Sequence, residues 1–112
     1  MDANLYFGYN GLPTNQALPF WFFITGNLSV GRHLFTKDNV KFNESFIRYG
    51  YEDIECGYRL WQKGLNVYYN PQAQAIHDHL LTIENFITRE ENNAANILQF
   101  CAMHPDPVLA EN

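Results

Sequence analysis

The sequence predicts an α+β fold with short strands and a long C-terminal helix. Three features indicate it: short apolar runs bounded by turn residues, one amphipathic segment that stops at a glycine, and a longer one near the C-terminus. The chain has 112 residues, enough for one domain. Glycines, prolines and asparagines punctuate residues 1–20, where we expect an N-terminal loop region, and residues 21–112 form the expected domain.

Three segments are expected to be strands. Residues 21–25 form an aromatic and β-branched run that Gly26 ends. Residues 65–69 and 72–79 alternate in polarity, and an Asn-Pro turn separates them. Strands so few and so short indicate part of a larger structure.

Three further segments are expected to be helical. Residues 32–37 form the shortest, and residues 51–63 form the clearest, because apolar side chains recur there at helical spacing until Gly64. Thr82 is the expected N-cap of a long helix that ends at His104. The apolar stripe of this long helix consists of Phe86, Ile87, Ala94, Ile97, Leu98 and Cys101.

The charge and the cysteine content argue against some functions. The formal net charge is −5 and the seven basic residues are scattered, which argues against a nucleic-acid partner. The two cysteines, Cys56 and Cys101, are too few for a disulfide framework, so a reduced, cytoplasmic setting is expected. The longest apolar stretch is far shorter than the roughly 20 residues of a membrane span. Peripheral membrane association through another part of a longer protein stays compatible with the sequence.

Glu52 and Asp53 are the first candidates for chemistry. They are adjacent in the first turn of the predicted helix, directly after Gly50 and Tyr51. The helix dipole favours negative charge at this end, and an ionised carboxylate can accept a proton from an attacking hydroxyl. Acidic residues are also common in first turns for structural reasons alone, so this pattern does not by itself predict catalysis.

His77 and His79 are the second candidates, because alternate residues of a strand share a face and could bind one metal. No third ligand occurs at a recognisable spacing, so the alternatives are a metal site shared with residues outside this chain and two solvated histidines. Asn27, next to Gly26, could approach a ligand closely or could be an ordinary polar turn residue. Tyr51 could stack on a sugar ring.

Taken together, these segments resemble the C-terminal half of family 2 glycosyltransferases and the related galactosyltransferase C-terminal domain. The resemblance covers roughly residues 20–105 and rests on five landmarks in the family's order. They are the G-N-x-S segment at 26–29, F-x-E-x-F at 42–46, G-x-E-D-x-E-x-G-Y-R-L at 50–60, P-x-A at 71–73 and H-x-H at 77–79.

The resemblance implies a GT-A architecture, in which an N-terminal half binds a nucleotide-sugar donor and the C-terminal half binds a glycan acceptor. It implies that Asp53 is the general base and that Glu52 contacts the acceptor. It implies that His77, with His79 as the less favoured ligand, completes a manganese or magnesium site with a D-x-D motif. The metal would stabilise charge on the departing nucleotide diphosphate, and transfer would invert the anomeric carbon. The substrate-binding positions would be Asn27, Gly26, Tyr51 and Gly50.

The chain departs from this family in one large respect. It has no D-x-D motif, and no nucleotide-binding βαβ half precedes residue 20. We therefore expect the isolated chain to fold but to be inactive, and we expect an exposed apolar face that could support a homodimer. The alternatives are a non-catalytic carbohydrate-binding or interaction module and, more remotely, a metal hydrolase that uses His77 and His79.

Overall fold

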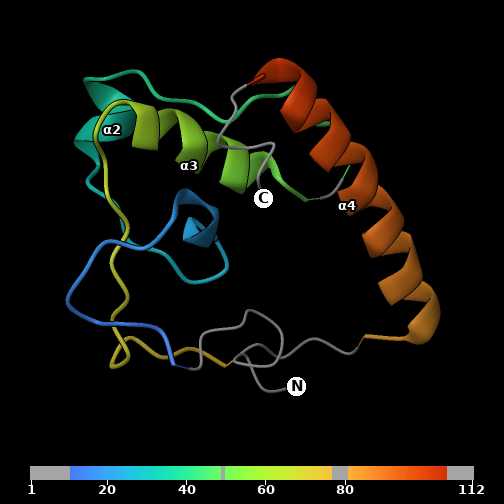
Figure 1. Cartoon of the computed structure of the whole chain (residues 1–112), viewed down its shortest axis with the longest axis horizontal. Helices are drawn as coiled ribbons and strands as arrows, with labels where there is room; N and C mark the ends of the chain where they lie inside the picture. The colour runs from blue at the N-terminus through green and yellow to red at the C-terminus, as the bar shows by residue number, and fades with distance from the viewer. Residues whose placement is uncertain (1–10, 49, 77–80, 106–112) are drawn as a thin grey trace.

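The computed structural model of the chain describes residues 11–48, 50–76 and 81–105. Within these ranges the regular elements are helical (Figure 1). They are, in order, the 3₁₀ helix η1 (Phe20–Phe22) and the α-helices α2 (His33–Thr36), α3 (Glu52–Gln62) and α4 (Ile83–Met103).

The prediction of a strand over residues 21–25 is wrong. Pro19, at φ −58°, precedes the single 3₁₀ turn of η1. The turn is closed by two hydrogen bonds: the Phe22 amide donates to the Pro19 carbonyl at 3.1 Å, and the Phe23 amide donates to the Phe20 carbonyl at 3.0 Å. The turn buries Phe20 and Phe23 together. A short apolar run fits a buried helical turn as well as a buried strand, and here the turn forms.

The other two predicted strands are not formed in the described residues either. Over 65–69 the β pairing is one antiparallel bridge, in which the Leu18 amide donates to the Val67 carbonyl at 2.7 Å. Residues 72–76 follow a turn in which the Asn70 side chain accepts from the Gln72 amide at 3.0 Å. Such a side-chain bond competes with strand formation. Residues 77–79 lie outside the described part of the chain.

The helix predictions are confirmed. α2 lies within residues 32–37, and α3 ends at Gln62, two residues before Gly64. Thr82 is the N-cap of α4, since its Oγ1 accepts from the Asn85 amide at 3.1 Å. Within the described ranges, no helix is both long enough and apolar enough to cross a membrane.

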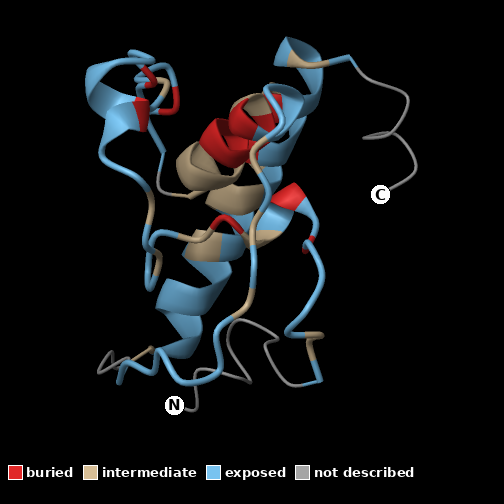
Figure 2. Ribbon diagram, turned by 90° about the vertical axis from the view of Figure 1, so that its left-hand side faces the viewer, coloured by how far each residue is buried: buried red, intermediate tan, exposed pale blue. Residues whose placement is uncertain are grey.

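The core consists of two clusters that meet on α3 (Figure 2). One contains Phe23, Leu34, Val40, Cys56 and Leu60, and the other contains Phe20, Phe46, Tyr58 and Phe100. Gly57 lets α3 and η1 approach closely, because a Cβ there would lie 2.4 Å from the Cβ of Phe23. Both clusters therefore depend on α3 and η1 packing against each other.

α4 turns inward a face that lies beside the apolar stripe, and not the stripe itself. A helix normally packs its apolar stripe against the core. Here the stripe side chains are exposed, with Leu98 at 73% and Ile87 at 51%. The buried residues of α4 are Asn96, 1% exposed, and Phe100, 4% exposed, and both lie in its C-terminal half. Cys101 on the stripe is exposed, whereas Cys56 on α3 is buried.

Candidate functional site

The candidate site is the turn that leads into α3. Gly50 has φ 103° and Tyr51, the N-cap, has φ 71°, so two consecutive residues are left-handed. This conformation suits glycine but costs a residue with a bulky side chain about 1–3 kcal/mol. Tyr51 makes no side-chain cap bond. Contacts from elsewhere must therefore hold the turn, and it places Glu52 and Asp53 at the first helical positions.

α4 supplies those contacts. The Asn96 amide Nδ2 donates to the carbonyls of Gly50, at 2.6 Å, and Arg48, at 3.2 Å. The Tyr51 ring lies 6.0 Å from the Phe100 ring, centroid to centroid. Burial, and to a lesser extent the charge of Cys101, raises the pKa of Tyr51. The phenol therefore remains protonated through the neutral pH range.

Asp53 is held by a segment far away in the sequence. Its Oδ2 accepts from the backbone amide of Thr25 at 3.1 Å and from the Thr25 hydroxyl at 3.3 Å, across 28 residues. Its Oδ1 accepts from the Ile54 amide at 2.8 Å. The structure thus brings Asp53 next to the segment that contains Gly26 and Asn27. Thr25 was not among the predicted site residues, although it precedes them directly.

Glu52 differs from Asp53 in having an unsatisfied atom. The side chain is half-buried, and its Oε2 is buried without a hydrogen-bond partner among the described residues. A buried carboxylate oxygen without a donor is costly. A hydroxyl group delivered to this place would relieve that cost.

Asn27 is engaged with the chain itself. Its Nδ2 donates to the Ala73 carbonyl at 2.9 Å, which ties residues 25–27 to the turn at 70–73. The predicted metal ligands His77 and His79 follow this turn but lie outside the described residues. In the ranges that are described, no group of three or more His, Cys, Asp or Glu side chains is placed to hold a metal ion.

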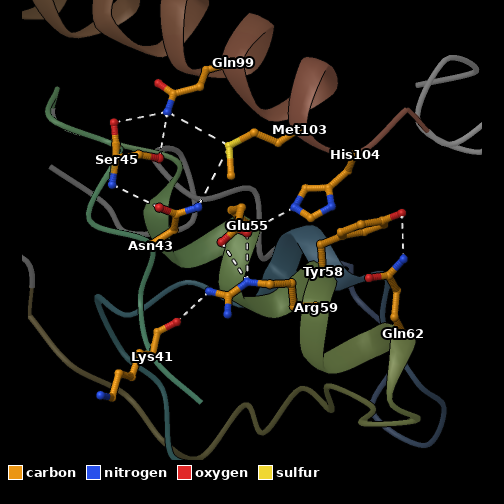
Figure 3. A network of polar contacts seen from close by, with 10 residues as sticks. All are labelled: Lys41, Asn43, Ser45, Glu55, Tyr58, Arg59, Gln62, Gln99, Met103 and His104. Carbon is orange, nitrogen blue, oxygen red and sulfur yellow. Dashed lines mark hydrogen bonds and ion pairs between the residues drawn. The ribbon is translucent and has the colours of Figure 1, made fainter. Parts of the chain in front are cut away.

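A second polar cluster, centred on Glu55, was not predicted (Figure 3). Glu55 is 0% exposed, and Arg59 Nε contacts its two carboxylate oxygens at 2.8 and 3.0 Å. His104 Nε2 lies 3.0 Å from Oε1 of the same carboxylate, and Arg59 Nη2 donates to the Lys41 carbonyl at 2.6 Å. The cluster joins α3 to the end of α4 and to the segment before Phe42. In the sequence, this cluster is indicated only by the spacing of Glu55 and Arg59, which are four residues apart on a helix.

Comparisons with known proteins give one partial match. The chain is 40% identical over 60 residues to a Bacillus subtilis (strain 168) protein named as the uncharacterized glycosyltransferase YfnE. The match spans 54% of this chain and 15% of the relative's length. No protein-family model and no solved structure matches the chain. Over about half its length, then, the chain is similar to a protein of the glycosyltransferase class.

Proposed function

We propose that this chain is the acceptor-binding part of an inverting GT-A glycosyltransferase, with Asp53 as the general base. The observation that carries the proposal is the pair of hydrogen bonds from Thr25 to Asp53. This pair joins the carboxylate turn to the Gly26–Asn27 segment, so two landmarks that are distant in the sequence lie next to each other. The similarity to a protein named as a glycosyltransferase supports the same class.

The bonds of Asp53 suggest which of its atoms takes the proton. A carboxylate has about four lone-pair positions, two on each oxygen. Oδ2 accepts both bonds from Thr25, whereas Oδ1 accepts one from Ile54. We therefore assign Oδ1 as the base. The acceptor hydroxyl gives its proton to Oδ1 while its oxygen bonds to the anomeric carbon, and the carbon–oxygen bond to the nucleotide diphosphate breaks with its electron pair.

Glu52 would bind the acceptor in this scheme. Its Oε2 has no donor among the described residues, and a second sugar hydroxyl is the donor that an acceptor glycan would bring. Gly50 and Tyr51 form the turn beneath the acceptor, and Asn27 borders it from the other segment while holding the Ala73 turn.

A manganese or magnesium ion remains part of the proposal. His77, with His79 as the less favoured ligand, would complete a site whose D-x-D motif lies outside this chain. When bound, the ion would stabilise the charge of the leaving diphosphate. A homodimer through an exposed apolar face also remains a prediction, which sedimentation at several protein concentrations tests.

The test is sugar transfer from a panel of nucleotide sugars with manganese, by this chain and by the complete gene product that contains it. Asp53→Asn should lower kcat by about 100- to 10,000-fold, the usual contribution of a general base, while donor binding persists. Asp38→Asn, at an exposed carboxylate, is the matched control. Near-normal turnover by Asp53→Asn would refute the assignment. Glycan binding without transfer would favour the non-catalytic module, and transfer by the 112 residues alone would refute the expected inactivity.

A further inference from the structure

The inward face of α4 is polar where it meets the turn before α3. Asn93, Asn96 and Phe100 follow one another at intervals of three and four residues, so they share one side of the helix. Asn96 is buried, and a Cβ on Gly50 would lie 2.4 Å from Asn93 Oδ1, which shows how closely α4 covers the turn. Burying an amide in a helix stabilises a protein only when it finds partners. Here the partners are the carbonyls of that turn.

Those carbonyls belong to the residues on the N-terminal side of the strained position. Asn96 binds the carbonyls of Arg48 and Gly50, and Tyr51 follows directly in the left-handed conformation. The Tyr51 carbonyl in turn accepts from the Glu55 amide at 2.9 Å, the first bond of α3. The chain of contacts from Asn96 thus ends at the helical turn that carries Glu52 and Asp53.

We propose that Asn96 is a positioning residue for the carboxylate pair, acting through the Gly50–Tyr51 turn. Asn96 acts through the backbone, because its Nδ2 donates to the carbonyls of Arg48 and Gly50. It keeps the turn left-handed, and the turn fixes the direction in which α3 begins. The part of the inference that concerns turnover rests on the proposed function of Asp53, whereas the part that concerns the turn does not.

The experiment compares Asn96→Ala with Gln99→Ala. Gln99 is the matched control, because it is an amide one turn further along α4 whose Nε2 also donates to a loop carbonyl, that of Ser45, at 3.1 Å. We expect Asn96→Ala to speed hydrogen exchange of the Glu55 amide at least about tenfold and to leave the Lys63 amide, at the other end of α3, unchanged. In the sugar-transfer assay of the complete gene product, the same substitution should lower kcat by about 10- to 100-fold with little change in the KM of the donor. Gln99→Ala should do neither.

If Asn96→Ala does not fold, the same substitution can be tested in a variant that also carries Tyr51→Gly. Glycine at position 51 adopts the left-handed conformation without help. In the Tyr51→Gly background, therefore, the further effect of Asn96→Ala on exchange and kcat should be smaller, and folding should be restored. An equal effect in both backgrounds, or unfolding in both, overturns the proposal.

The outcomes separate this inference from the proposed function. If the Glu55 amide of Asn96→Ala exchanges hydrogen at the wild-type rate, Asn96 does not stabilise the Gly50–Tyr51 turn. Changed exchange with unchanged kcat, when Asp53→Asn is inactive, overturns the positioning role. If Asp53→Asn turns over normally, the proposed function fails, and the exchange data alone then decide whether Asn96 holds the turn.

Discussion

α3 and α4 are both amphipathic helices, but α3 buries most of its apolar side chains, whereas α4 leaves most of its apolar side chains exposed. α3 buries Cys56, Tyr58 and Leu60 and forms the centre of both core clusters. α4 buries Asn96 beside Phe100 and leaves its apolar stripe exposed (Figure 2). The difference shows that an apolar stripe does not always face the body. Where a neighbouring turn has carbonyls that need donors, the amide-bearing face can pack inward instead.

The largest expected effect comes from the one large apolar side chain that α4 buries. Phe100→Ala should destabilise the chain by about 3–5 kcal/mol, because it leaves a cavity beside Tyr58 and Phe20. Leu98→Ala, two residues away and exposed, should change the free energy of unfolding by no more than about 0.5 kcal/mol. Urea denaturation of the three proteins measures both values. Equal losses in the two variants would remove the contrast between the faces of α4.

The next effect tests the polar contact between the two helices. Arg59→Met should cost about 3 kcal/mol, because it removes the guanidinium group that contacts the buried carboxylate of Glu55 at 2.8 Å. Arg32→Met, at an exposed arginine, is the control. If the stability of Arg59→Met equals that of the control, the Glu55 cluster does not tie α3 to α4.

For Gly57→Ala, the sign of the change in the free energy of unfolding is the test. Helix propensity alone would make alanine more stable than glycine by about 1 kcal/mol. The added Cβ would collide with Phe23 and approach the Phe20 carbonyl to 3.0 Å, so we expect a net loss of about 1–3 kcal/mol. A rise in the denaturation midpoint would show that η1 does not pack against α3 this closely.

The smallest effect concerns the exposed stripe itself. Ile87→Lys should alter the free energy of unfolding by at most about 0.5 kcal/mol, because the side chain is half exposed in the N-terminal half of α4. A loss of several kcal/mol would mean that the stripe is packed against something in the folded protein, and the contrast with α3 would then disappear.

The helices could be predicted because their signals are local. The Thr82 cap, the glycine after α3 and the apolar spacing of Tyr58 and Ile54 all lie within or next to the element they define. The strands could not, because a short apolar run is compatible with several structures. At 19–23 a proline and two buried phenylalanines produce a 3₁₀ turn instead.

The residues proposed for the candidate site have signals in the sequence, but the contacts between them do not. Glu52 and Asp53 stand out as adjacent acids at a helix start, and Thr25 is next to the Gly26–Asn27 landmark. The bond from Thr25 to Asp53 spans 28 residues and that from Asn96 to Gly50 spans 46. No pattern in one sequence encodes which distant donor will meet which acceptor.

The unequal surroundings of the two cysteines offer a spectroscopic handle. Burial raises the pKa of the Cys56 thiol and shields it, whereas Cys101 is exposed on the stripe of α4. Because the thiolate is the reactive form, a maleimide dye at neutral pH should attach at Cys101 and leave Cys56 unmodified. A dye with polarity-sensitive emission at that position would shift to the blue whenever another molecule or domain covers the stripe, without any substitution in the protein.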